Sequence, residues 1–197
     1  CSRTAPAAAS RSSSTTWAPD GRTLAAACYG GVRLIDPVIG GVARRLDWRG
    51  SMLSVAWRPD GKVIASGCQD HSVHFWRLPS GRDAQMTGYD AKPRDVAWSG
   101  DGRWLATAGG PRVCLWPFDG RGPEGRAPLE LDGHDEVITA LACAPLVRVL
   151  ASGDRQGRVC LWAPPEVTAP LATVELGARA VALAWTAGPT RPALTWL

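Results

Sequence analysis

The chain has 197 residues, 45% of them hydrophobic, and its 22 Lys and Arg against 18 Asp and Glu leave a formal net charge of +4. This composition predicts a globular protein with ample apolar material for a core, and because the positive charges form no basic run, nucleic acid is not an expected partner. No stretch approaches the roughly 20 consecutive apolar residues needed to cross a bilayer, so membrane insertion is not expected either.

The chain opens on a low-complexity segment, residues 1–14, that is rich in Ala and Ser and poor in large apolar residues. Such a composition does not fold by itself. Cys1 followed by this tether is similar to the start of a mature bacterial lipoprotein, so a lipid-tethered envelope protein is one alternative. Because no apolar signal segment precedes Cys1, we expect a cytoplasmic protein.

From residue 15 onward, a tryptophan that follows a short apolar run recurs at a nearly fixed interval. The steps are 40, 41, 45 and 42 residues between Trp17, Trp57, Trp98, Cys143 and Trp185, with Cys143 standing at the tryptophan position of the fourth repeat. A second landmark with the same period is a run of apolar residues that ends at Ile35, Trp76, Trp116 and Trp162. Two landmarks with one period predict structural repeats, which begin near residues 15, 54, 95, 138 and 181, the last one partial.

Each repeat reads as a series of short antiparallel strands. The first three repeats contain a turn of the Pro-Asp-Gly type, at residues 19–21, 59–61 and 100–102, and Gly in such a turn supplies the positive φ that closes a hairpin. A small-and-apolar strand follows each turn, the landmark run supplies the next strand, and less regular fourth strands are expected near residues 42–46, 84–87, 129–131 and 171–176. No segment predicts a helix.

The ordered recurrence of these turns and tryptophans, with Gly133-His134 before the fourth repeat, resembles the WD-repeat β-propeller family over roughly residues 15–185. The resemblance implies an all-β fold of four-stranded antiparallel blades. We expect five tryptophans to be buried between or within the blades: Trp57, Trp76, Trp98, Trp116 and Trp162. Closed propellers have 4 to 8 blades, so about four repeats and a partial fifth predict an incomplete or truncated ring.

The family often links His, Ser or Thr, Asp and Trp side chains in one hydrogen-bonded network per blade, and the resemblance assigns these positions here. The second repeat has Ser66, Asp70 and Trp76, but Trp48 stands at the histidine position. The fourth repeat has His134, Ser152 and Trp162, with Gln156 in place of the turn Asp. Tyr89 stands at the histidine position of the third repeat. Partial networks are therefore expected only in the second and fourth repeats.

The final strand, residues 182–185, is expected to lack partner strands and to leave Trp185 poorly covered. An unpaired strand edge favours association with another chain. The sequence therefore predicts that the isolated chain is not a well-behaved monomer and that edge-to-edge self-association relieves the exposed ends.

One group of side chains has the spacing of metal ligands. Cys68, His71 and His74 follow one another at intervals of three residues, but a strand-turn-strand directs such side chains differently and no fourth ligand is evident. A metal-binding or enzymatic propeller that uses this cluster is the alternative function. The expected state is no metal, no cofactor, no catalytic residue, and cysteines that remain reduced thiols.

The leading function is a non-catalytic scaffold that presents one propeller face to a protein or peptide partner, as the resemblance implies. The loops that enter each repeat and the turns between its second and third strands gather on that face. Aromatic and arginine side chains dominate binding hot spots. The partner-binding residues that we predict are therefore Trp48, Arg49, Tyr89, Lys92, Arg112, Arg155 and His71.

Overall fold

The computed structural model describes residues 15–145, 147–186 and 193–196, and these residues form strands, turns and loops without a helix. The strands make five antiparallel sheets. Sheet 1 contains β1 (Thr15–Trp17), β2 (Leu24–Asp36) and β3 (Gly41–Ser51). Sheet 2 contains β4 (Ala56–Trp57), β5 (Val63–Gly67), β6 (Val73–Arg77) and β7 (Asp83–Met86).

The remaining sheets continue the pattern along the chain. Sheet 3 contains β8 (Val96–Trp98), β9 (Trp104–Thr107), β10 (Arg112–Pro117) and β11 (Leu129–Asp132). Sheet 4 contains β12 (Ile138–Cys143), β13 (Leu150–Asp154), β14 (Arg158–Trp162) and β15 (Ala172–Glu175). Sheet 5 contains β16 (Leu183–Thr186) and β17 (Ala193–Trp196). The all-β prediction is confirmed, as are the four-stranded antiparallel sheets in the second, third and fourth repeats.

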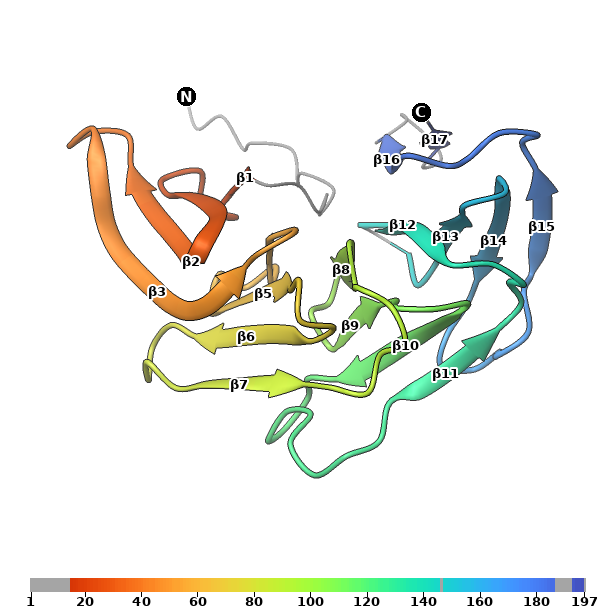
Figure 1. Cartoon of the computed structure of the whole chain (residues 1–197), viewed down its shortest axis with the longest axis horizontal. Helices are drawn as coiled ribbons and strands as arrows, with labels where there is room; N and C mark the ends of the chain where they lie inside the picture. The colour runs from red at the N-terminus through yellow and green to blue at the C-terminus, as the bar shows by residue number, and fades with distance from the viewer. Residues whose placement is uncertain (1–14, 146, 187–192, 197) are drawn as a thin grey trace.

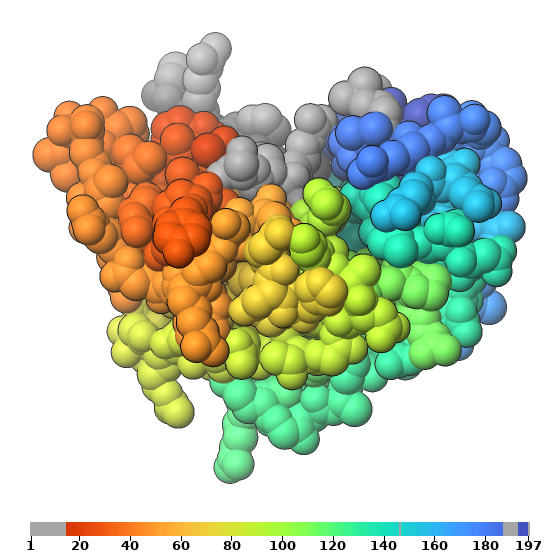
Figure 2. Space-filling model, viewed as in Figure 1, coloured from red at the N-terminus to blue at the C-terminus, as the bar shows by residue number. Residues whose placement is uncertain are grey.

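The five sheets follow one another around an arc, with β8 and β12 near its middle and β7, β11 and β15 on its outer side (Figure 1). Neighbouring sheets contact each other through their first strands: β1 with β4, β4 with β8, β8 with β12, and β12 with β16. In the described part of the chain, the sheets form an open arc rather than a closed ring (Figure 1). On the face shown in Figure 2, the surface of the molecule is continuous from sheet 2 to sheet 4.

The hairpin between the first two strands of a sheet forms as the turn residues predict. In sheet 2, the Asp60 carboxylate accepts the Lys62 backbone N–H at 3.0 Å, and Gly61 adopts a φ of 70° while its N–H donates to the Arg58 carbonyl at 2.9 Å. The same pair of interactions recurs at Asp20 and Asp101. These turns lie on one face of the molecule together with the connections that follow the third strand of each sheet. This face is called the turn face below.

Sheet 1 departs from the predicted pattern because two expected strands are joined in one. Strand β2 pairs first with β1 and then, from Tyr29 onward, with β3, with an irregularity in this second pairing between Tyr29 and Gly31. Both Gly30 and Gly31 have positive φ, and a Cβ at Gly31 would lie 2.0 Å from the Leu46 carbonyl oxygen. The two glycines bend the strand where other repeats have a polar turn, so sheet 1 has three strands instead of four.

The core lies between sheets rather than inside one layer. Four apolar clusters each combine residues of two consecutive sheets, from sheets 1 and 2 through sheets 4 and 5. Of the five tryptophans predicted to be buried, Trp116 is only partly buried, and the other four are at most 7% exposed. Each such side chain contributes roughly 1.5–3 kcal/mol by burial.

The expectation for the end of the chain was wrong. Strand β17 pairs with β16 in register from Leu183 opposite Trp196 to Thr186 opposite Ala193. Trp185 is 8% exposed, and its indole N–H donates to the Ala142 carbonyl at 3.0 Å. A short segment of mixed polarity supplies the partner strand, and a period-two apolar pattern is too weak in four residues to indicate it.

The described residues contain no helix that is long and apolar enough to cross a membrane.

Candidate functional site

Sheet 4 contains a complete chain of buried hydrogen bonds. The Trp162 indole N–H donates to Ser152 Oγ (2.8 Å), the Ser152 hydroxyl lies 2.7 Å from His134 Nε2, and His134 Nδ1 lies 2.9 Å from Asp154 Oδ2. Burial lowers the pKa of His134, so the neutral imidazole accepts from the Ser152 hydroxyl and donates to the carboxylate. Burial alone would raise the pKa of Asp154, but the hydrogen bonds from His134 and the Arg158 N–H lower it overall.

This network corrects the assignment of Gln156 to the turn position. The aspartate is Asp154, whose Oδ1 also accepts the backbone N–H groups of Gln156, Gly157 and Arg158 at 2.9–3.0 Å. It stands at the end of β13, two residues before the position that alignment with Asp70 indicates. The carboxylate can therefore order the following turn and the histidine together. An Asp directly after Ser-Gly was the available sequence signal.

Sheet 3 has a network of its own, which was not expected. The Tyr89 hydroxyl lies 2.7 Å from Thr107 Oγ1 and accepts the Trp116 indole N–H at 2.8 Å. Tyrosine thus replaces the histidine of sheet 4 with one atom that both donates and accepts. Burial raises the pKa of Tyr89, so the hydroxyl stays protonated.

Sheet 2 does not form the partial network that was predicted for it. Ser66 donates to the Ser54 carbonyl at 2.5 Å, and Asp70 accepts from the Ser72 hydroxyl at 2.6 Å. The reason is the residue at the histidine position: the Trp48 ring stacks on His74, with centroids 3.9 Å apart. A flat aromatic stack fills the space in which an acceptor histidine would bind the serine.

The proposed metal ligands of sheet 2 do not come together. The Cys68 thiol points toward Met52 Sδ at 3.6 Å, His74 lies under Trp48, and His71 is exposed in the turn with a φ of 62°. Among the residues that the structure describes, no group of three His, Cys, Asp or Glu side chains is placed to hold a metal ion. The five described cysteines, Cys28, Cys68, Cys114, Cys143 and Cys160, are free thiols.

The loops entering each sheet and the turns after its second strand form the second face of the molecule, called the loop face below. Four of the predicted binding residues are exposed there, Lys92 is half-buried, and Trp48 and Tyr89 are half-buried with their rings packed into the sheets. The exposed residues are Arg49, His71, Arg112 and Arg155.

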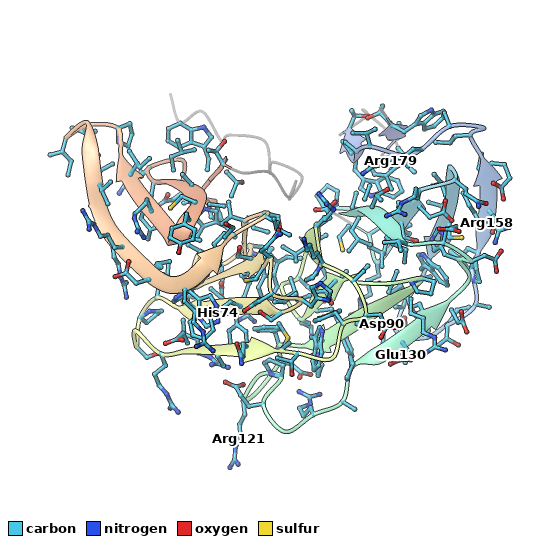
Figure 3. All side chains as sticks on the ribbon, in the orientation of Figure 1. His74, Asp90, Arg121, Glu130, Arg158 and Arg179 are labelled. Carbon is cyan, nitrogen blue, oxygen red and sulfur yellow. The ribbon has the colours of Figure 1, made fainter. Side chains whose placement is uncertain are left out.

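A hollow of about 210 Å³ lies on the loop face of sheet 3. Tyr89 and Arg112 line it, together with two acidic residues that were not among the predicted binding residues, Asp90 and Glu130. Figure 3 shows Asp90 and Glu130 close together beside sheet 3. Arg112 lies 3.4 Å from Glu130 and 3.9 Å from Asp132, all with more than half of their side chains exposed. The hollow therefore combines a fixed aromatic ring with exposed charges of both signs.

Comparison with known proteins gives one family. The model of the WD domain, G-beta repeat (WD40) matches residues 45–77, 83–117 and 125–163, more than half of the chain. The LST8 homolog of Drosophila melanogaster is 31% identical over an alignment of 99 residues, and the match covers 48% of this chain and 32% of that protein.

Two solved structures share the fold. A chain of the Mitotic Checkpoint Complex superposes with a TM-score of 0.77 at 20% identity, over 91% of this chain and 55% of that one. The β-propeller domain of Cps50 (Swd1) from Myceliophteria thermophila gives a TM-score of 0.75 at 19% identity, over 89% of this chain and 59% of that one. This chain therefore spans somewhat more than half the length of these structures and about a third of the LST8 homolog.

Proposed function

Because the chain belongs to the WD40 repeat family, we propose that it is a non-catalytic scaffold that binds a protein or peptide partner on its loop face. The hollow beside Tyr89 and Arg112 is the observation that carries this proposal. A ring held by two hydrogen bonds loses little freedom on binding, and an exposed arginine beside it adds a residue type that is frequent in hot spots.

Two of the three histidines are not available as general bases, which supports a scaffold at these positions. His134 is committed to Ser152 and Asp154 inside sheet 4, and His74 is buried under Trp48. A general base must reach the proton that it removes from a substrate, which neither ring can do. The free thiols of the described cysteines support a reducing compartment, and the cytoplasm is therefore the proposed location.

The test compares two pairs of substitutions on opposite faces. A partner recovered by affinity purification is titrated by calorimetry against the wild type, against Arg112→Ala with Arg155→Ala on the loop face, and against Arg22→Ala with Lys62→Ala on the turn face. The loop-face variant should bind at least about tenfold more weakly, a loss of roughly 1.4 kcal/mol, and the turn-face variant should bind as the wild type does. The reverse pattern would place the partner on the other face and contradict the proposal.

Association of two copies through the ends of the arc remains a prediction. Trp17 in sheet 1 is 52% exposed and Trp196 in sheet 5 is 54% exposed, so large apolar side chains are available at both ends. Light scattering on the 197-residue chain measures this directly. A monodisperse monomer at all concentrations would contradict it.

A further inference from the structure

The first strand of most sheets carries a tryptophan that reaches back to the preceding sheet. Trp57 donates its indole N–H to the Thr16 carbonyl (3.2 Å), Trp98 to the Ala56 carbonyl (3.2 Å), and Trp185 to the Ala142 carbonyl (3.0 Å). The corresponding residue of sheet 4 is Cys143. Its Sγ lies 3.8 Å from the Ala97 carbonyl oxygen, so the smaller side chain faces the same acceptor.

A cavity of about 380 Å³ lies between sheets 3 and 4, where this indole is missing. Its walls include Trp104, Leu115, Cys143 and Leu150, with Pro164 and the turn residues 99–101 at the turn face. These walls are largely apolar, and apolar cavities of this kind accept aromatic guests.

The interface between sheets 2 and 3 shows what fills the equivalent space. Trp98 is 1% exposed there, and its ring meets Phe118 edge-on at a centroid distance of 4.6 Å. Phe118 in turn lies 5.0 Å from Phe75. In repeat register, Cys143 replaces Trp98, Pro164 replaces Phe118, and Leu115 replaces Phe75. Three aromatic rings of the interface between sheets 2 and 3 thus have no counterpart at the equivalent positions between sheets 3 and 4.

The mouth of this interface differs as well. Between sheets 2 and 3, the Arg58 side chain closes the turn face by donating to the Gly102 carbonyl at 2.8 Å and the Phe118 carbonyl at 3.4 Å. Ser99 stands at the same register position in sheet 3, and its short side chain donates to Asp101 at 2.6 Å instead. The cavity between sheets 3 and 4 therefore stays open to the turn face.

We propose that this cavity, which we call the indole pocket, binds a tryptophan side chain of a partner polypeptide. The three other interfaces show that an indole fits between adjacent first strands. The Ala97 carbonyl, the counterpart of their acceptors, accepts the Cys143 thiol at 3.8 Å, and an indole N–H is a stronger donor than this thiol. Exposed charges at the rim, Asp101 and Arg148, can hold the backbone and neighbouring side chains of a peptide that crosses the mouth. A partner bound here contacts the turn face, so the indole pocket is independent of the proposed loop-face site.

The experiment titrates N-acetyl-tryptophanamide into methyl-labelled wild-type protein and follows the Leu and Val methyl resonances by NMR. The resonances of Leu115, Val149 and Leu150 should shift and saturate, and those of Leu34 and Leu78, at the interface of sheets 1 and 2, should not. N-acetyl-leucinamide should bind at least about fivefold more weakly, because a leucine leaves part of the space empty and lacks an N–H donor. No saturable shift up to about 10 mM, or shifts centred on Leu34 and Leu78, would overturn the proposal.

Two variants test the pocket from the protein side. Cys143→Trp supplies the missing indole from within and should weaken binding at least about tenfold, whereas Cys143→Ala leaves the space open and should bind as the wild type does. Undiminished binding to a folded Cys143→Trp protein would refute the pocket. If that variant does not fold, the titration of the wild-type protein that follows its methyl resonances tests the pocket by itself. Acetyl-Gly-Trp-Gly-amide should bind at least as tightly as N-acetyl-tryptophanamide. Binding of N-acetyl-tryptophanamide without binding of this peptide would refute a polypeptide partner.

Discussion

The Trp48 indole stacks on the His74 imidazole at 3.9 Å with the two planes inclined by 25°, and both rings are held in a site where their polar atoms are buried without hydrogen-bond partners. The His74 Nε2 atom lies 3.0 Å from Asp83 Oδ2, but the direction of approach is not that of a hydrogen bond. Burial therefore lowers the pKa of His74, and the attraction of Asp83 and Asp70 offsets this only in part.

This arrangement predicts a loss of stability in mild acid. A histidine of the unfolded chain binds a proton below about pH 6.5, whereas folded His74 resists protonation, so the free energy of unfolding falls as pH drops below that value toward the lowered pKa. His74→Phe keeps an aromatic ring under Trp48 and removes the titration. Urea unfolding at several pH values between about 7 and 5 should give a shallower pH dependence for the variant than for the wild type. Parallel curves would contradict the account.

Tyr89 should contribute to stability through its hydroxyl group. Tyr89→Phe leaves the Trp116 indole N–H without its acceptor and Thr107 without its neighbour, and we expect a loss of about 1–3 kcal/mol in the free energy of unfolding. Tyr29→Phe is the matched control because Tyr29 is 81% exposed. Denaturant titration of both variants checks this prediction. Equal stability of the two would show that the sheet 3 network contributes nothing to the free energy of unfolding.

The networks of sheets 4 and 2 should respond differently to the same substitution. Ser152→Ala leaves His134 and the Trp162 indole N–H buried without their partner, and a loss of about 2–4 kcal/mol is expected. Ser66→Ala removes a hydroxyl that donates only to backbone carbonyls, those of Ser54 and Gly67, so the loss should stay near 1 kcal/mol. Thermal or urea unfolding compares the two directly. A larger effect at Ser66 would mean that sheet 2 holds a linked network after all.

The repeat period and the turns were predictable because they depend on local chemistry. A Pro-Asp-Gly turn closes a hairpin whatever surrounds it, and a landmark residue that recurs every 40 to 45 residues marks the same position in the first strand of each sheet. The networks were less predictable because they depend on which side chains meet across strands. Asp154 and Gln156 both lie near the turn, and only the packed structure shows that the first reaches His134. Tyr89 could be placed at the histidine position, but its two hydrogen bonds required the positions of Thr107 and Trp116.

The loop between β10 and β11 should be held by an ion pair of modest strength. Arg77 in β6 donates to both carboxylate oxygens of Glu124 at 2.5 and 2.7 Å, and these bonds lower the pKa of Glu124 against the effect of burial. Glu124→Gln should cost at most about 1 kcal/mol, since the pair is partly exposed, but should speed proteolysis of residues 119–128. Cleavage of the wild type should also accelerate at high salt, which screens the pair. Unchanged cleavage in both cases would contradict this role.

The interface of sheets 2 and 3 should tolerate loss of its indole poorly, because Trp98 is almost completely buried there. Trp98→Cys copies the arrangement of sheet 4: the buried indole disappears, the Ala56 carbonyl loses its donor, and Phe118 loses a ring contact at 4.6 Å. The transfer and cavity contributions together predict a loss of about 3–5 kcal/mol in the free energy of unfolding. Trp196→Cys is the control, since Trp196 is 54% exposed, and its effect should stay below about 1 kcal/mol.

N-acetyl-tryptophanamide should raise the melting temperature of Trp98→Cys more than that of Trp196→Cys, because only the first substitution opens a second space shaped by an indole. If the amide raised the melting temperatures of the two variants by the same amount, the space between first strands would have closed when the ring was removed.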